Sequence, residues 1–559
     1  MAYGDSSPTW TGQPRIRGGS ESMRMFLLTF SLIGLQFCWG TEQTYATPYL
    51  LALGLSKGAM SLVWVAGPLS GLIMQPIIGM ISDKSTSKYG RRRPFMIGGT
   101  VAVAVCLLIL GWAIEIVEWF VPGTGAEVVE RRRALTIRLA IFDIYVLDFV
   151  INIAQATCRA LVVDALPVEK QQTGGAWITR MVGLGHILVF GFGALDLNYW
   201  LPPMLGDTQF KKVCAFAAFM MVFTFSVNCW AVTEKVLVAD PRSATDSDQS
   251  LLAIIKQIYS RALHVPQRIQ YICNVQFWSW IGWFPLMFYG STWVGEIYLR
   301  HGLDGIPPSS TDALSQVGRA GSTALIIHST IGFVTAIILP TLVTSPGDDE
   351  KAYSFTPRPP KGLEAVAKVP FVKPHLLDVW TFGCAMFTSC LLFAPVVKSV
   401  RFATFLMAAA GIPSAIAGFA SATLIGVEIN RLGSTLPTSG PKGTRTPNSR
   451  RSSNDFEMDE PSLLRRPSQS GAHSQSGELS GIYLGILNIY TTIPQFVGTF
   501  ISFVVFRILE PGKSPELAKD AHPDDVHSRE GLSGIGVCLF IGSMSSIMAA
   551  LATRKLKER

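Results

Sequence analysis

Twelve separate stretches of the chain are dominated by apolar side chains over about twenty residues each. A helix of about twenty residues crosses the hydrocarbon core of a bilayer, and within lipid a helix satisfies its own backbone hydrogen bonds. We therefore expect an all-α membrane protein with twelve transmembrane helices. The expected spans lie near residues 25–53, 60–82, 95–117, 136–160, 174–199, 213–232, 270–294, 316–344, 376–396, 403–427, 481–506 and 531–552.

The fourth span carries an aspartate and an arginine, Asp148 and Arg159, on one stripe of its helix. Eleven residues at about 100° each return almost to the starting face. A charge within hydrocarbon is costly, so both side chains should face an internal cavity rather than lipid. Many spans with charge on an inward stripe indicate a polytopic transporter.

Composition agrees with a membrane protein. The 559 residues are 49% hydrophobic and 15% charged, whereas a soluble domain carries about a quarter charged residues. The net charge of +8 could suggest nucleic acid. However, most Lys and Arg lie in short segments beside spans, where topology and anionic lipid headgroups explain them better. We expect no nucleic-acid partner.

The nine cysteines lie in or beside apolar spans without metal-ligand spacing, so neither a metal site nor a structural disulfide is expected. The polar N-terminal segment lacks the pattern of a cleaved signal, which makes the first span an uncleaved anchor. No phosphate-binding loop, zinc-protease motif or nucleophile elbow is present. The sequence therefore predicts neither an enzyme nor a cofactor.

The distribution of Lys and Arg predicts that both chain ends are cytoplasmic. The strongest element is the loop 83–94, which holds five basic residues. One segment disagrees, because Arg131, Arg132 and Arg133 would then lie outside.

Loop lengths divide the chain into two bundles of six helices, a plan typical of secondary transporters whose halves rock around a central site. The predicted parts are a cytoplasmic tail (1–24), an N-terminal bundle (25–232), a central loop (233–268), a C-terminal bundle (269–552) and a short tail (553–559). Segment 429–480, within the second bundle, is rich in Ser, Pro and Gly and is expected to be disordered.

Short motifs in that segment suggest regulatory partners. Residues 450–468 include two basophilic kinase-like sites and an acidic dileucine-like sequence, which would contact a kinase and a sorting adaptor. Motifs this short recur by chance, so a plain solvated linker is the alternative.

The sequence GMISDKSTSKYGRRRP at 79–94 resembles the loop between spans two and three of the major facilitator superfamily. In such a gating loop, a small residue allows close helix approach, an acid pairs at the gate, and arginines contact headgroups. The alternative is a purely topogenic basic loop. The candidate gating residues are Gly79, Asp83, Gly90, Arg91 and Arg92.

Four segments read together resemble the sucrose (glycoside):proton symporters of plants and fungi, in the glycoside–pentoside–hexuronide:cation branch of that superfamily. They are 68–95, the pattern from Asp148 through Asn152 to Leu161, WIGWFPLMFYGSTWVGEIY at 280–298, and GILNIYTTIPQ at 485–495. The resemblance implies the 6+6 major facilitator fold, and symport of sucrose or a related α-glucoside such as maltose, driven by the proton gradient.

The resemblance implies that Asp148 carries the proton and also contacts sugar hydroxyls. Elementary chemistry agrees, because burial in general raises the pKa of a carboxyl group and an approaching arginine lowers it. Arg159 lies too far along the helix to pair with Asp148 directly. Asn152, one turn away, would share the sugar, whereas Asp143 is expected to reach the outer interface.

Other polar residues inside spans extend the candidate site. Glu42, beside Gln43, would be a second proton site, a sugar acceptor or a hydrogen-bonded structural acid. Arg319 occupies the place of a functional arginine in the family, but its nearest carboxylate in the sequence is Asp312. Lys57 departs from plant members, many of which have histidine there.

Aromatic rings stack on the apolar faces of sugars, and amide side chains form hydrogen bonds with sugar hydroxyl groups. Trp283, Asn488 and Gln495 therefore complete the predicted sugar site. An interfacial aromatic belt is the alternative for the tryptophan. The expected location is the plasma membrane, or else a vacuolar or endosomal membrane. A transporter-like sugar sensor, a vacuolar exporter and sodium coupling remain alternatives.

Overall fold

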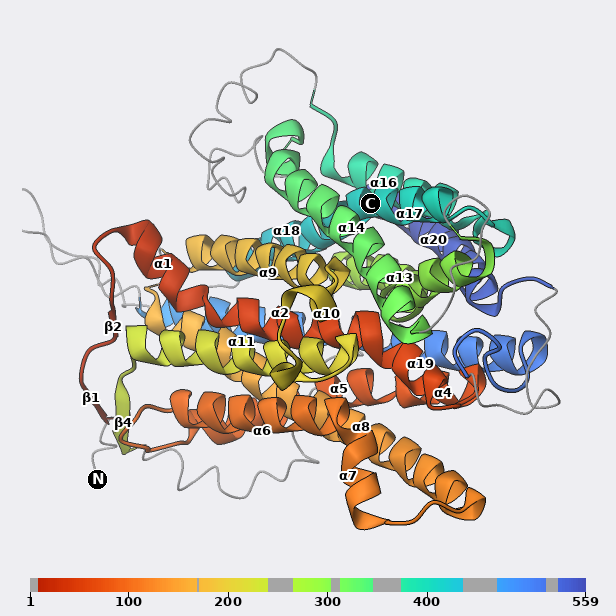
Figure 1. Ribbon diagram of the computed structural model, residues 1–559. Helices are drawn as coiled ribbons and strands as arrows, with labels where there is room; N and C mark the ends of the chain where they lie inside the picture. Colours follow the sequence, from red (N-terminus) through yellow and green to blue (C-terminus); the bar gives the residue numbers. More distant parts are fainter. Residues whose placement is uncertain are drawn as a thin grey trace, which may run out of the picture.

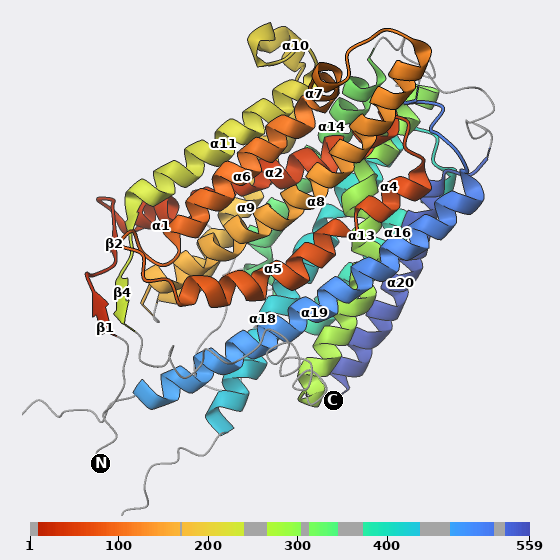
Figure 2. The same ribbon diagram turned by 90° about the horizontal axis from the view of Figure 1, so that it is seen from below.

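The computed structural model describes residues 9–167, 170–239, 265–302, 312–344, 373–435, 470–518 and 531–558. Within these ranges the helices form twelve spans, close to the positions that the apolar stretches predict, and the spans group into two bundles (Figures 1 and 2). We call the end of the bundles at which the first described residues and the end of the last helix lie the inner end, and the opposite end the outer end (Figure 2).

The first bundle begins with a span built from four short segments, namely α1, α2, a π-helical turn and α3. The π-turn shifts the register of the helix in the middle of the span. The helices of this bundle are α1 (Glu21–Thr29), α2 (Ser31–Thr41), the π-turn (Glu42–Ala46), α3 (Thr47–Ala52), α4 (Lys57–Val63), α5 (Ala66–Asp83), α6 (Arg93–Gly111), α7 (Ala113–Phe120), α8 (Ala126–Ala165), α9 (Gln171–Ala194), α10 (Leu197–Trp200), the 3₁₀ turn Pro203–Leu205 and α11 (Gln209–Ala231).

The second bundle packs its long seventh span, α13, against the eleventh and twelfth spans, α19 and α20. Its elements are α13 (Gln267–His301), α14 (Ala313–Leu342), α16 (Leu376–Leu391), the 3₁₀ turn Ala394–Val396, α17 (Val400–Ala409), α18 (Gly411–Thr435), α19 (Ser470–Leu509) and α20 (Gly534–Lys557).

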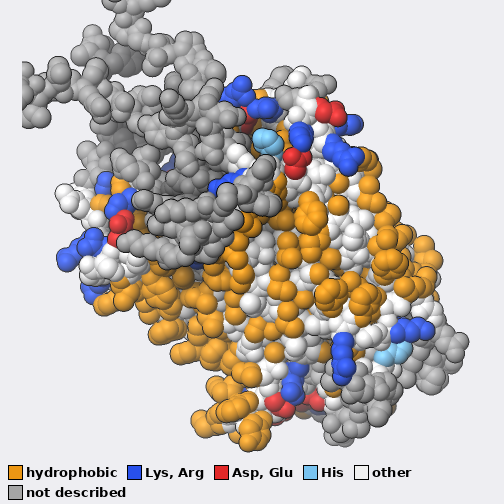
Figure 3. Space-filling view, turned by 90° about the horizontal axis from the view of Figure 1, so that it is seen from above, with side chains coloured by type: hydrophobic (Ala, Val, Ile, Leu, Met, Phe, Trp, Pro, Cys, Tyr) orange, Lys and Arg blue, Asp and Glu red, His pale blue; other side chains and the backbone are white. Residues whose placement is uncertain are grey.

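Ten helical stretches of the described chain are long and apolar enough to cross a membrane. Helices α8 and α13 are not among them, although both run the length of their bundles (Figure 2). Charged side chains, among them Asp143 and Asp148, lower the hydropathy of α8, whereas amide, hydroxyl, Trp and Tyr side chains lower that of α13. On the face seen in Figure 3, apolar side chains cover the middle and charged ones gather toward the two ends.

At the inner end, the segment before α1 pairs with the segment after α11. Strand β1 (Thr9–Thr11) runs antiparallel to β4 (Val236–Ala239), and β2 (Arg15–Ile16) runs antiparallel to β3 (Val232–Thr233). The guanidinium of Arg17 adds a cation–π contact, 4.4 Å from the ring centroid of Trp230. The tail 1–24 and the start of the loop 233–268 therefore contain short strands.

The arginines that contradict the predicted orientation have local partners. Arg133 Nε donates to the carbonyl oxygen of Leu53, 2.7 Å away, and Arg132 Nε donates to that of Val121, also at 2.7 Å. Both carbonyls lie just beyond a helix C-terminus, where cations are favoured. These two arginines therefore stabilise helix ends, and their presence on the outer side does not argue against the predicted orientation.

The two bundles touch along the outer half of the molecule. Thr47 Oγ1 donates to the carbonyl oxygen of Phe288 at 3.1 Å, and Ser291 Oγ donates to that of Gln43 at 2.6 Å. A Cβ added to Gly318 would overlap the ring of Tyr45. The first span thus lies directly against α13 and α14, and an opening between the bundles has to separate these groups.

The expected disordered segment 429–480 is helical at both ends, because α18 reaches Thr435 and α19 begins at Ser470. Residues 436–469, with the kinase-like and dileucine-like motifs at 450–468, lie outside the described residues.

Candidate functional site

Asp148 and Asn152 lie on one buried stripe of α8, with Gln155 and Arg159 further along it. Asp148 is 1% exposed and Asn152 is 2% exposed, whereas Arg159 is exposed. Neither carboxylate oxygen of Asp148 has a hydrogen-bond partner among the residues that the structure describes. The structure therefore encloses Asp148 between helices, where we expected a cavity-lining position, and solvent reaches it only after a rearrangement.

Helix α5 faces this stripe with small and polar residues. Gly67 lies so close that a Cβ there would be 4.0 Å from both Asp148 carboxylate oxygens and from the ring of Phe288. Asn152 Nδ2 donates to Ser70 Oγ at 3.0 Å, and Gln75 Nε2 donates to Asn152 Oδ1 at 3.2 Å. Phe288 belongs to the second bundle, so Asp148 lies where the two bundles meet.

Glu42 brings a second carboxyl group to Asp148 from the first span. It lies in the π-helical turn and is fully buried, and within the described part of the chain neither of its carboxylate oxygens has a hydrogen-bond partner. Asp148 is its strongest charged neighbour, followed by Asp143. Two acids from separate spans thus share an apolar environment, with no ion pair to either among the described residues.

Asp143 does not reach the outer interface as expected. It is 4% exposed, and its Oδ2 atom has no hydrogen-bond partner in the described ranges, while the thiol of Cys106 is within side-chain hydrogen-bonding range. Its position, five residues from Asp148 and about 140° around the helix, turns it toward the interior of the first bundle. The expectation was wrong because α8 extends well beyond the predicted span, to Ala126.

The two candidate arginines do not join the acids. The Arg159 side chain makes no hydrogen bond or ion pair with any residue that the structure describes. Arg319 Nη1 lies 2.8 Å from Asp196 Oδ2, and both side chains are partly exposed at the outer end. Asp312, the nearest acid in the sequence, instead caps α14 by accepting from the backbone N–H of Ser315 at 3.1 Å.

The sugar-site candidates of the second bundle are spread over two helices. The Trp283 ring packs on Phe387, with 4.3 Å between centroids, and Gln495 Nε2 donates to the carbonyl oxygen of Thr491 at 3.0 Å. Asn488 is half-buried on α19, which packs against α4 and α5. None of the three contacts the α8 stripe among the interactions of the described residues, whereas Phe288 reaches it through Gly67.

The predicted gating loop forms a compact charged cluster at the inner end. Arg92 pairs with Asp83 and, through Nε, with Asp164 Oδ2 at 2.8 Å. Arg91 Nε lies 3.1 Å from the same Asp164 oxygen, and its Nη1 lies 3.6 Å from Asp83. Gly79 does not mediate close packing, because a Cβ there would meet no atom within 4 Å.

Glu234, which the sequence gave no reason to select, organises this loop. Its carboxylate accepts the backbone N–H groups of Arg91, Arg92 and Arg93 at 2.8–3.0 Å, at the N-terminus of α6. Burial raises the pKa of Glu234, although the backbone N–H donors oppose that shift. Gly90 adopts a positive φ of 105°, and a Cβ there would press against the Glu234 side chain.

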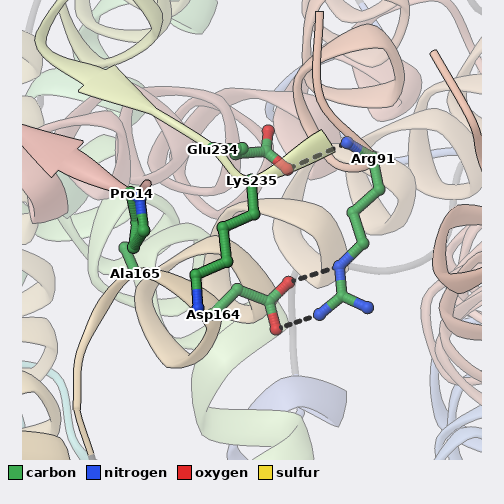
Figure 4. Close-up of a pocket in the computed structure, with 6 residues that line it drawn as sticks. All are labelled: Pro14, Arg91, Asp164, Ala165, Glu234 and Lys235. Atoms are coloured by element: carbon green, nitrogen blue, oxygen red, sulfur yellow. Dashed lines mark hydrogen bonds and ion pairs between the residues drawn. The ribbon is translucent and has the colours of Figure 1, made fainter. Parts of the chain in front are cut away.

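A pocket of about 190 Å³ lies beside this cluster (Figure 4). It is smaller than the 300–1,000 Å³ typical of ligand sites, so we do not assign it to a sugar. Its lining residues are Pro14, Arg91, Asp164, Ala165, Glu234 and Lys235.

Sequence reasoning missed Ser70, Gln75 and Gln155, which extend the polar stripe. Gln155 Oε1 accepts the Trp39 indole N–H at 3.1 Å. Two of them had a usable signal, because Gln75 and Gln155 are isolated amides in apolar spans.

Comparisons with known proteins agree with this arrangement. Residues 29–164 match the family model described as MFS/sugar transport protein. The chain is 35% identical over 325 residues to the general alpha-glucoside permease of Schizosaccharomyces pombe, covering 58% of this chain and 56% of that protein. It is 28% identical to sucrose transport protein SUC4 of Arabidopsis thaliana, covering 57% and 63%. The matches thus span less than two thirds of these relatives.

Solved structures share the fold across nearly the whole chain. A bacterial homologue of the human lysosomal transporter Spinster superposes with a TM-score of 0.54 and 13% identity, covering 97% of this chain and 99% of that chain. A D-xylose–proton symporter superposes with a TM-score of 0.51 and 12% identity, covering 96% and 98%. The chain therefore has the major facilitator fold of a multi-pass membrane protein, and its sequence is similar to the α-glucoside permease and to the sucrose transport proteins.

Proposed function

We propose that the protein is a proton-coupled symporter of sucrose or a related α-glucoside such as maltose. The observation that carries the proposal is the pair of enclosed carboxyl groups, Glu42 and Asp148, from two spans at the meeting point of the bundles. The names of the relatives, an alpha-glucoside permease and sucrose transport proteins, support the sugar class.

The chemistry of an enclosed acid pair suits proton coupling. Two negative charges without a cation or a hydrogen-bond donor are very unfavourable in an apolar environment, and bound protons remove that cost. When the bundles separate and water enters, the same groups can release protons and accept hydrogen bonds from sugar hydroxyls. Sugar binding and proton binding then involve the same side chains.

Asp148 is proposed as the primary proton carrier, because it lies beside the polar groups of Asn152 and Gln75. Glu42 is proposed as its partner acid and as a further sugar contact, together with Gln43. Arg159, which is exposed on the same stripe, approaches Asp148 only if another conformation brings it there. Arg319, paired with Asp196 at the outer end, is assigned to the contact between bundles and not to proton transfer.

The proposed driving force is the proton gradient, with no further cofactor. We place the protein in the plasma membrane with the inner end in the cytoplasm, which agrees with the basic cluster at that end. A vacuolar or endosomal location is the competing placement.

The test is expression in a yeast strain that cannot take up disaccharides, with sucrose or maltose added to a weakly buffered suspension. Uptake of labelled sugar with transient alkalinisation of the medium is the expected result. Uptake that persists after a protonophore removes the gradient, or that requires sodium, would refute proton coupling. Binding of the sugar without uptake would indicate a sensor.

A further inference from the structure

A buried cluster of five charged residues joins the two bundles at the outer end, and the proton-carrier site does not include it. Lys57 Nζ lies 2.7 Å from Glu296 Oε1 and 2.9 Å from Glu510 Oε2. Arg300 Nε lies 2.7 Å from Glu516 Oε1, and its Nη2 lies 3.8 Å from Glu510 Oε1. We call these five residues the outer ion cluster.

The first bundle contributes only Lys57 to the outer ion cluster. Lys57 is the first residue of α4, whereas Glu296 and Arg300 lie on α13, and Glu510 and Glu516 follow α19. The Lys57 side chain is 0% exposed, and those of Glu296 and Glu510 are 2% and 4% exposed. One ammonium group therefore carries every ion pair between the bundles in this cluster.

The burial of the cluster decides how much the ammonium matters. An exposed ion pair contributes little, but removing one partner from a buried pair leaves an uncompensated charge and is strongly destabilising. Without Lys57, Glu296 and Glu510 would face each other in a closed contact, with Arg300 as the cation that the ion pairs of the described residues place near both. Closure of the outer end therefore depends on the ammonium, and opening has to bring water to all of these charges.

A separate ion pair between the bundles, Arg319 with Asp196, differs in this respect. Arg319 and Asp196 have side-chain exposures of 39% and 44%, so water screens their attraction. Rupture of that pair leaves both charges solvated. The Lys57 contacts and the Arg319–Asp196 pair lie at one end of the molecule, but of these the Lys57 contacts carry the large penalty when one partner is removed.

We propose that Lys57 is a positioning residue that holds the outer ends of the bundles together, and that Lys57 has to leave Glu296 and Glu510 before the outer side opens. This inference rests on the proposed alternating-access transport, to which it adds the contact that sets the balance between the two conformations. It predicts that neutralising Lys57 shifts the population toward an outward-open state.

The experiment measures the distance between spin labels at Trp119→Cys on α7 and Ile508→Cys on α19, in purified full-length protein reconstituted in lipid nanodiscs. Both positions are at the outer end, with exposures of 79% and 70%, while the nine native cysteines are buried. The parent should show a mainly short distance. Lys57→Met should raise the long-distance fraction about tenfold or more, as loss of a buried charge partner predicts.

Lys211 supplies a control with a buried ammonium group whose partner carboxylates are 43% and 73% exposed. Its Nζ also contacts two carboxylates, those of Glu115 and Asp207 (2.6 Å from the latter), and its side chain is 9% exposed, but all three residues belong to the first bundle. Lys211→Met should leave the distance distribution unchanged. Equal opening in both variants would overturn the proposal, because general loosening of the bundle would then explain the effect.

An unchanged distribution in Lys57→Met also overturns the proposal. If that variant does not fold, the pair Lys57→Met with Glu510→Gln keeps the net charge of the cluster, and it should open by a smaller factor. A mainly short spin-label distance in the double variant, as in the parent, overturns the proposal as well. The distance measurement needs no sugar, so failure of sugar uptake by the parent would refute the proposed function separately.

Discussion

Asn152 Nδ2 donates a hydrogen bond to the backbone carbonyl oxygen of Asp148, 2.9 Å away and one helical turn earlier. The same atom lies 3.0 Å from Ser70 Oγ, and the Asn152 Oδ1 atom accepts from Gln75. These bonds fix the Asn152 amide without involving the Asp148 carboxyl group. The acid is therefore held beside an ordered polar patch while its own oxygens stay free to exchange a proton or meet a ligand.

Asp148→Asn should abolish accumulation of sugar against its gradient, because an amide cannot carry the coupled proton. Exchange of internal for external sugar should remain measurable in proteoliposomes, since the amide still forms hydrogen bonds. A suitable control is Asp378→Asn, which removes an exposed carboxylate 2.6 Å from Lys557 at the inner end. Unchanged pH-dependent accumulation in Asp148→Asn would exclude Asp148 as the proton carrier.

Asn152→Leu should weaken apparent sugar affinity about tenfold and leave the pH dependence of transport unaltered. The substitution removes the amide and leaves Gln75 without one of its partners, a loss typically worth about 1–3 kcal/mol when the remaining group is buried. The KM for the sugar, measured at several pH values, tests this. A shift of the pH profile without a change in KM would assign Asn152 to the proton and not to the sugar.

Glu42→Gln separates the three roles left open for this acid. If Glu42 shares protons with Asp148, the variant should transport sugar with fewer protons per cycle and a shifted pH optimum, because one of two coupled acids is lost. The proton-to-sugar ratio in proteoliposomes is the decisive measurement. An unchanged ratio with raised KM would indicate a sugar acceptor, and a purely lower stability would indicate a structural acid.

Glu234→Ala should lower the unfolding temperature of the purified protein by a few degrees. The change removes the acceptor for three backbone N–H groups at the start of α6, and loss of a helix cap costs about 1–2 kcal/mol. Glu234→Gln, which keeps an acceptor oxygen, should lose less. Lys235→Ala, in the same pocket, serves as the control and should behave like the parent.

The contact between Glu516 and Arg300 should make stability depend on pH in the acid range. Burial opposes ionisation of Glu516, but Arg300 and Lys57 outweigh it and lower the pKa of that carboxyl below its ordinary value of 4.5. The contribution of this ion pair to the free energy of unfolding is therefore complete above about pH 4.5, and it is lost as the pH falls through the lowered pKa. Glu516→Gln should be less stable than the parent at neutral pH, and the difference should vanish on acidification. A constant difference at every pH would contradict this origin.

The amino-acid sequence alone determined the twelve spans and the shared face of Asp148 and Asn152. Hydropathy and the 3.6-residue helical period are local properties, so these predictions needed no knowledge of neighbouring helices. The same reasoning singled out Arg91, Arg92 and Asp83, because residues within one tight loop lie close in any fold.

The tertiary structure alone decided which charges meet. The partner of Arg319 is Asp196 and not Asp312, Asp143 is buried and not interfacial, and Lys57 reaches Glu296 and Glu510 on the other bundle. Each of these outcomes depends on which helices pack together and how far each one extends. Which charged groups attract each other depends on their spatial distance and their burial in the folded protein. The number of residues between them in the sequence determines neither.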